Sequence, residues 1–142
     1  MRYLGLDLGS RTLGVAVSDK TGIIASKVDT IHHNEEYDRL LDDVSRLVND
    51  LEIEAIVLGF PKNMNNTIGP KGELSLEFKD KLEKKLNIPV YLQDERLSTK
   101  SAIDTLIKGD VSRKDRKKVV DSVAATIILQ TFLDRRDKNE EK

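Results

Sequence analysis

Three acidic residues, far apart in the chain, stand in sequence contexts where a carboxylate is uncommon. Asp7 interrupts the alternating run LGLDLG, Glu95 follows the short apolar run VYLQ within DERLST, and Asp121 borders the apolar stripe of VVDSVAATIILQ. An unpaired charge at any of these places is costly, because each is expected beside buried surface. One shared explanation accounts for all three: the carboxylates converge on a cation at one edge of a sheet.

Carboxylate oxygens without histidine or cysteine form a hard site that suits Mg²⁺ or Mn²⁺. Two such ions about 4 Å apart stabilise the attacking and leaving oxygens of an in-line displacement at phosphorus. The predicted chemistry is therefore phosphodiester hydrolysis by metal-activated water, with Asp7 bridging both ions. Each acid also has a structural alternative: a turn beside Gly9, an ion pair of Glu95 with Arg96, and a favourable charge of Asp121 in an early helix turn.

The first of these acids lies in a predicted β-hairpin. Residues 4–8 alternate leucine with glycine or aspartate, a two-residue period typical of a strand with one apolar face. Residues 13–17 repeat the alternation after a turn at residues 10–12, and a third strand follows in residues 23–31. The three strands are expected to form an antiparallel meander, with small residues leaving space beside Asp7.

Helices and strands then alternate through the next part of the chain. Residues 35–51 have the three-and-four spacing of an amphipathic helix, with Asn34 as its cap. Residues 54–60 form a continuous apolar run, which indicates a strand buried on both faces in a parallel part of the sheet. A loop is expected over residues 61–72.

The remaining elements bring the other two acids to the sheet. A second helix, apolar at every fourth residue from Leu74 to Leu86, stops before a short strand in residues 90–93. A last helix has the apolar stripe Val120, Val123, Ala124, Ile127 and Ile128, with Asp121 aligned with Ala124, Ala125 and Ile128. The pattern predicts an α/β fold with a mixed sheet.

Composition bounds the class of protein. A length of 142 residues predicts one domain, over residues 1–135, with a charged and frayed tail over residues 136–142. The chain has no cysteine, which excludes disulfides and a cysteine nucleophile and fits a reducing compartment. Because no apolar run approaches the roughly 20 residues of a membrane span, we expect a cytoplasmic protein with no membrane partner. His32 and His33 lack metal-ligand spacing and are expected to be a wet loop pair.

Contacts to phosphate must come from local clusters, because the net charge of −1 gives no overall attraction to nucleic acid. Only the segment SRKDRKK crowds several cations together. We expect phosphate contacts from residues in three places, Arg11, Arg96 and the basic segment with Arg113, Lys114, Arg116 and Lys117. The alternative for the basic segment is a solvated helix entrance.

Four motifs, in order along nearly the whole chain, resemble the YqgF family, also called the RuvX or pre-16S rRNA nuclease family, of the ribonuclease H-like fold. The motifs are GLDLGSRTLGVAVSD, GFPKNMNNTIGP, DERLST and VVDSVAATIILQ. The resemblance implies a five-stranded mixed sheet, its first three strands antiparallel, flanked by helices. It also implies that Asp7, Glu95 and Asp121 bind divalent metal.

The resemblance implies a metal-dependent nuclease that trims the 5′ end of pre-16S rRNA, with structured RNA as its partner. The alternative is a Holliday junction resolvase acting on four-way DNA, by analogy with RuvC. RuvC-like resolvases carry two acids on the last helix, whereas this chain has Ala124 three residues after Asp121. That departure weakens the resolvase alternative and leaves a fourth ligand open between Asp19 and Asp94.

The expected assembly differs between these alternatives. A resolvase cuts two symmetric strands and is expected to be a homodimer, whereas a trimming nuclease can be a monomer. Two remoter functions are a non-catalytic RNA-binding factor and a nucleotide-binding module of the actin-like type, which shares the strand-turn-strand opening. The length of the chain supplies only one half of such a module.

Overall fold

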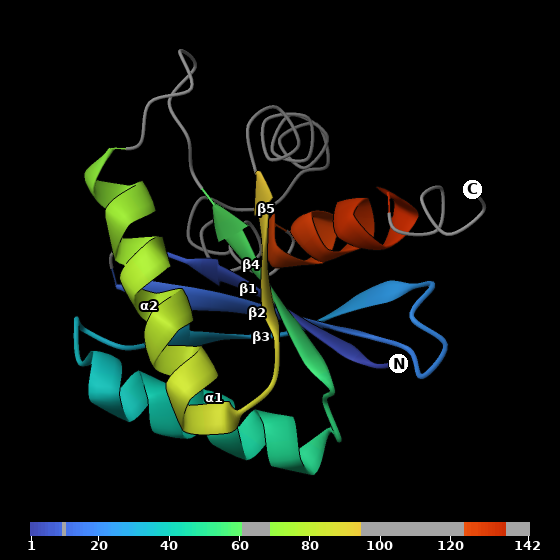
Figure 1. The fold of residues 1–142 in the computed structure, drawn as a ribbon, viewed down its shortest axis with the longest axis horizontal. Coiled ribbons are helices and arrows are strands. Elements are labelled where there is room, and N and C mark those ends of the chain that lie inside the picture. Colours follow the sequence, from blue (N-terminus) through green and yellow to red (C-terminus); the bar gives the residue numbers. More distant parts are fainter. Residues whose placement is uncertain (10, 61–68, 95–123, 136–142) are drawn as a thin grey trace, which may run out of the picture.

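Five strands form one mixed sheet in the computed structural model, which describes residues 1–9, 11–60, 69–94 and 124–135 (Figure 1). The strands pair in the order β3-β2-β1-β4-β5, so β1 lies at the centre. Their bounds are β1 Tyr3–Leu8, β2 Thr12–Ser18, β3 Ala25–His32, β4 Ala55–Phe60 and β5 Val90–Asp94. The helices are α1 Tyr37–Asp50, α2 Pro70–Leu86 and a helical segment over residues 124–135, called here the 124–135 helix.

The predicted meander and the predicted fold class are confirmed. β1 pairs antiparallel with β2, and β2 pairs antiparallel with β3. β4 pairs parallel with both β1 and β5, and every residue of β4 is buried. A parallel strand covered on both faces reads as a continuous apolar run, which is why its sequence shows no alternation.

The sheet separates two apolar clusters, one on each face. Leu4 and Leu6 of β1 pack with the apolar stripes of α1 and α2. Tyr3 of β1 packs instead with the 124–135 helix, through Ile128 and Leu129 among others. Figure 1 shows the same division, with α1 and α2 on one side of the sheet and the 124–135 helix, in red, on the other. Alternation along β1 therefore assigns each of its residues to one face.

The start of α1 differs from the prediction. The helix begins at Tyr37, its N-cap position is Glu36, and no side chain caps it. Asn34 has a left-handed backbone with φ of 46°, so the expectation that it caps the helix is wrong. The chain needs residues 34–36 to turn from β3 into the helix, and the Glu36 N–H donates to the His33 carbonyl at 2.7 Å.

The second helix begins earlier than predicted. α2 starts at Pro70, so the expected loop over residues 61–72 is wrong for its last three residues, and residues 61–68 lie outside the described ranges. Proline suits the first helical turn because its missing N–H has no partner there in any case. The predicted stop is confirmed: α2 ends at Leu86, and Asn87 adopts a left-handed conformation with φ of 54°.

The 124–135 helix lies unusually close to β1 at Gly5. A Cβ atom on Gly5 would stand 2.7 Å from the Leu129 Cβ and 3.1 Å from the Ala125 carbonyl oxygen. The side chain of Gln130 also fixes this helix to the sheet edge, since its amide oxygen accepts from the Ala25 N–H at 2.8 Å. Within the described ranges, no helix is long and apolar enough to cross a membrane.

We predict that Gly5→Ala lowers the free energy of unfolding, because the new methyl group has no room against the Leu129 Cβ and the helix backbone. The expected loss is about 1–3 kcal/mol, the usual cost of overpacking a core. Urea titration measures it, with Ser26→Ala on the exposed part of β3 as the control. Equal stability of Gly5→Ala and Ser26→Ala would show that the helix moves away from β1 without cost.

Candidate active site

Asp7 lies near the carboxyl end of the central strand, on the face covered by the 124–135 helix. Tyr3, Gly5 and Asp7 share this face by alternation, and Tyr3 and Gly5 both contact the 124–135 helix. The Asp7 side chain is partly buried, and its neighbour across the antiparallel pair is Gly14. The prediction of small residues beside this carboxylate is therefore confirmed, and the space they leave is on the helix side of the sheet.

The register of the parallel strands brings a second small residue to this place. Leu6 pairs with Leu58, so the register continues with Gly59 beside Asp7. Gly59 in turn pairs with Gln93 of β5, whose side chain is 6% exposed. The register thus places Gly14 on one side of Asp7 and, on the other side, Gly59 followed by the buried amide of Gln93. Such a surface can accept charged groups and bound ions that an apolar surface would exclude.

The 124–135 helix runs in the opposite direction to β1. The Phe132 ring stands 5.7 Å from the Tyr3 ring, and one to two turns earlier Leu129 and Ala125 meet Gly5. The amino end of the 124–135 helix therefore lies toward the carboxyl end of β1, where Asp7 is. Ala124, Ala125 and Ile128, the residues predicted to share the face of Asp121, are all buried.

Several predicted site residues lie outside the described residues. These are Glu95, Arg96, Asp121 and the basic cluster Arg113, Lys114, Arg116 and Lys117. Their roles remain predictions. In the part of the chain that the structure describes, no group of three metal-ligating side chains is found. Arg11 is described: it is exposed at the turn between β1 and β2, a position open to a phosphate ligand.

The prediction of a wet histidine pair is wrong for His33. His32 is exposed, but His33 is only 4% exposed and packs against the Tyr37 ring at 5.3 Å. Its Nε2 lies 3.0 Å from the Gly9 carbonyl oxygen, immediately beyond β1. The sequence did hold a signal, since Ile31 points to the α1 side of the sheet and alternation directs His33 to the same side.

Asp19, one of two candidates for a fourth ligand, lies at the end of the sheet opposite to Asp7. It follows β2, and Leu4 pairs with Val17 there, so Asp19 lies by the amino end of β1 while Asp7 lies near its carboxyl end. Its carboxylate closes the turn between β2 and β3 by accepting from the Ile23 and Ile24 N–H groups at 2.8 and 3.0 Å. Asp94, the other candidate, ends β5 and pairs with Phe60.

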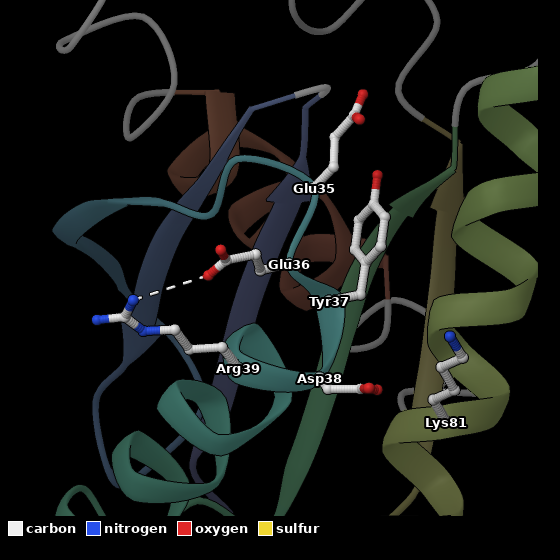
Figure 2. Close-up of a pocket in the computed structure, with 6 residues that line it drawn as sticks. All are labelled: Glu35, Glu36, Tyr37, Asp38, Arg39 and Lys81. Carbon is white, nitrogen blue, oxygen red and sulfur yellow. Dashed lines mark ion pairs between the residues drawn. The ribbon is translucent and has the colours of Figure 1, made fainter.

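A pocket of about 470 Å³ opens at the start of α1, close to the His33 loop (Figure 2). Figure 2 shows Glu35 and Tyr37 pointing the same way, while Arg39 reaches back to Glu36 with a nitrogen–oxygen distance of 3.7 Å. Burial, together with the charge of Glu35, raises the pKa of the Tyr37 hydroxyl. The lining mixes charges of both signs, so the pocket has no clear preference for an anion or a cation.

The arrangement of the sheet and its helices is similar to that of a solved structure. RuvC from Thermus thermophilus, in complex with a Holliday junction substrate, superposes with a TM-score of 0.59 over 96% of this chain and 96% of that chain. The sequence identity is 17%, so the likeness concerns the fold. The chain therefore has the ribonuclease H-like fold that the family resemblance implied.

Sequence comparison gives the family. The family model RuvX, described as Holliday junction resolvase, matches residues 1–135. A protein of Bacillus subtilis (strain 168) named "Putative pre-16S rRNA nuclease" is 56% identical over 135 residues, which cover 94% of this chain and 98% of the relative. A protein of Listeria monocytogenes serotype 4b (strain F2365) with the same name is 51% identical over 135 residues, with the same coverage. The chain belongs to the RuvX family, and the prediction of a nuclease that hydrolyses phosphodiester bonds is confirmed at the level of the family.

We predict that Asp19→Asn changes acid stability and leaves cleavage at neutral pH unchanged. Hydrogen bonds from the Thr21 hydroxyl and then from the Ile24 and Ile23 N–H groups hold the pKa of Asp19 well below its ordinary value of 3.8. A depressed pKa stabilises the fold above the ordinary value, and this contribution is lost as the pH falls below it. Asp19→Asn should therefore show a smaller loss of unfolding free energy between neutral pH and about pH 3.

Urea titration at the two pH values measures this difference, and Asp50→Asn at the exposed end of α1 is the matched control. A fall in metal-dependent cleavage with Asp19→Asn would return this residue to the candidate ligands.

Proposed function

We propose that this protein is a divalent-metal-dependent nuclease that hydrolyses phosphodiester bonds in structured RNA, with the 5′ end of pre-16S rRNA as its substrate in the cytoplasm. One observation carries the proposal: Asp7 lies on the face of the central strand that the 124–135 helix covers, and the amino end of this helix lies toward Asp7. The contact of Gly5 with Leu129 and Ala125 sets the level at which the two elements meet.

The alternation of β5 supports Glu95 as the second ligand. Tyr91 of β5 stacks on Phe132 with ring centroids 5.4 Å apart, so Tyr91 faces the 124–135 helix. Gln93 follows two residues later on the same face, opposite Gly59. Glu95 is the next residue of this series, two residues beyond Gln93, which supports a carboxylate on the same face of the sheet as Asp7.

The helical period supports Asp121 as the third ligand. Residues four apart lie one above the other on a helix, and Asp121 precedes Ala125 by four. Ala125 packs against Gly5, two residues before Asp7 on the same face of β1. One turn of helix rises about 5.4 Å and two strand residues about 6.8 Å, so these steps carry Asp121 to the level of Asp7.

The donor set suits Mg²⁺ or Mn²⁺. Three carboxylates supply hard oxygen ligands, and the two glycines around Asp7 leave space for a hydrated ion. When bound, the metal supplies an activated water and offsets charge on the leaving oxygen. The role of the chain is to hold the carboxylates together, with Asp7 at the centre. Arg11 and the basic segment bind the phosphates of the substrate.

The RNA substrate is favoured over a four-way DNA junction by Ala124. RuvC-like resolvases carry a second acid on the last helix, three residues after the first, and here that position holds an alanine that is 3% exposed. The names of the relatives point to pre-16S rRNA, whereas the family description names the Holliday junction. A monomer suffices for trimming a single RNA end, and a homodimer is required by the alternative.

The substrate experiment offers precursor rRNA, single-stranded RNA and a four-way DNA junction to the purified protein with Mg²⁺ or Mn²⁺. We expect cleavage of precursor rRNA near the mature 5′ end and no symmetric cutting of the junction. Symmetric junction cleavage by a dimer would select the resolvase alternative, and binding of precursor rRNA without any metal-dependent cleavage would select the RNA-binding factor.

We predict that Asp7→Asn, Glu95→Gln and Asp121→Asn each lower Mg²⁺-dependent cleavage by more than about 100-fold, beyond the usual effect of changing an outer-shell group. Each change removes a negative charge and one metal oxygen with little change in volume. Single-turnover cleavage of the substrate measures the effect, and circular dichroism checks the fold. Asp50→Asn is the control, with cleavage unchanged. Full activity in any of the three variants would remove that residue from the site.

We predict that replacing Arg113, Lys114, Arg116 and Lys117 by alanine weakens RNA binding and flattens its dependence on salt. Each cation that contacts a phosphate contributes about 0.7 to the slope of log K against log salt for a single strand. Fluorescence anisotropy at several salt concentrations measures the slope. Lys84→Ala with Lys85→Ala, at the end of α2, is the control and should leave it unchanged. An unchanged slope in the fourfold variant would leave the basic segment as solvated surface.

A further inference from the structure

We propose that the His33 imidazole is a positioning residue for the metal-binding end of β1, because it holds the Gly9 carbonyl in place. This inference rests on the proposed function, since it gives His33 a role in orienting the Asp7 carboxylate. His33 is far from Asp7 in sequence and comes from the loop between β3 and α1.

Two hydrogen bonds fix the imidazole and its tautomer. The Glu35 N–H donates to Nδ1 at 3.0 Å, so this nitrogen carries no proton. The proton is therefore on Nε2, which donates to the Gly9 carbonyl oxygen at 3.0 Å. The ring thus connects the backbone of the loop between β3 and α1, at Glu35, to the backbone just beyond β1, at Gly9.

The backbone of His33 holds the other side of the same turn. Its N–H donates to the Arg11 carbonyl oxygen at 2.9 Å, and the Gly9 N–H donates to the Thr12 carbonyl oxygen at 2.8 Å. The turn between β1 and β2 is thus held at Gly9 by the His33 side chain and at Arg11 by the His33 backbone. Movement of the turn would break both contacts together.

The loop before α1 has a backbone conformation that costs free energy, and the two contacts of His33 offset this cost. Asn34 and Glu35 have successive left-handed backbones, with φ of 46° and 66°, which non-glycine residues adopt reluctantly. This conformation is what brings the Glu35 N–H onto Nδ1. The imidazole is 4% exposed and lies against the Tyr37 ring, so water has little access to replace either hydrogen bond.

The contact matters for the site because Gly9 follows Asp7 by two residues. A shift of the Gly9 peptide would rotate the end of β1 and turn the Asp7 carboxylate away from the other ligands. Groups that orient metal ligands without touching the metal typically change affinity or activity 10- to 100-fold when they are replaced. His33 fits this role through the backbone of β1.

A different role is that His33 only stabilises the loop before α1, through Nδ1. Two substitutions separate the roles, because the amide of asparagine stands near the position of Nδ1 and that of glutamine near Nε2. His33→Asn can keep the acceptor for the Glu35 N–H and loses the donor to Gly9. His33→Gln keeps the donor to Gly9 and loses the acceptor.

The experiment measures Mn²⁺ affinity by calorimetric titration, together with kcat and KM for cleavage. We expect His33→Asn to raise the Mn²⁺ dissociation constant and lower kcat by about tenfold or more with KM unchanged, and His33→Gln to stay within about threefold of wild type. His32→Asn, at the exposed neighbour, is the matched control and should equal wild type. Urea titration defines conditions in which every variant is folded.

The outcomes distinguish this inference from the proposed function. Wild-type affinity in His33→Asn, or a tenfold loss in a folded His33→Gln, would overturn the positioning role, whatever the substrate. If His33→Asn does not fold, the His33→Gln result decides. If wild type itself binds no Mn²⁺, the proposed function fails, and amide exchange at Gly9, whose N–H donates to the Thr12 carbonyl oxygen, then tests the contact alone. Faster exchange in His33→Asn than in His33→Gln supports the contact, and equal rates contradict it.

Discussion

The close approach of the 124–135 helix to Gly5 is the constraint on which the rest of the structure depends. Without a Cβ at Gly5, the Leu129 Cβ and the Ala125 carbonyl lie directly against the central strand. Contact between a helix backbone and a strand backbone allows little sliding, because interiors are packed to crystal-like density. The level of the helix along β1 is therefore fixed.

The two faces of the sheet differ in composition. The face under α1 and α2 holds an apolar cluster that includes Leu4 and Leu6, the larger of the two clusters among the described residues. The opposite face is apolar at the amino end of β1, where Tyr3 meets Phe132, and becomes small and polar toward Asp7, beside Gly14. One strand thus packs its even-numbered residues against α1 and α2 and presents its odd-numbered residues to the face covered by the 124–135 helix.

The sequence was sufficient for the elements whose periodicity comes from the sheet and the helices, and insufficient for the turns. Alternation in β1 predicts an antiparallel hairpin, and the apolar run of β4 predicts a parallel strand buried on both faces, because burial requires those patterns. The cap at Asn34 was predicted wrongly because it depends on a left-handed turn that no local pattern indicates. The burial of His33 was missed, although alternation from Ile31 indicates it. Alternation also places Asp7 and Gln93 on the helix side, but the level of the helix comes from Gly5, a tertiary contact.

The most direct test of the account is a crystal structure of the protein with Mn²⁺, with the ion located by its anomalous scattering. We expect Mn²⁺ at the carboxyl end of β1, with oxygens of Asp7, Glu95 and Asp121 within about 2.2 Å of the metal. An ion bound elsewhere, or Asp121 turned away from the sheet while Asp7 remains on the helix side, would contradict it.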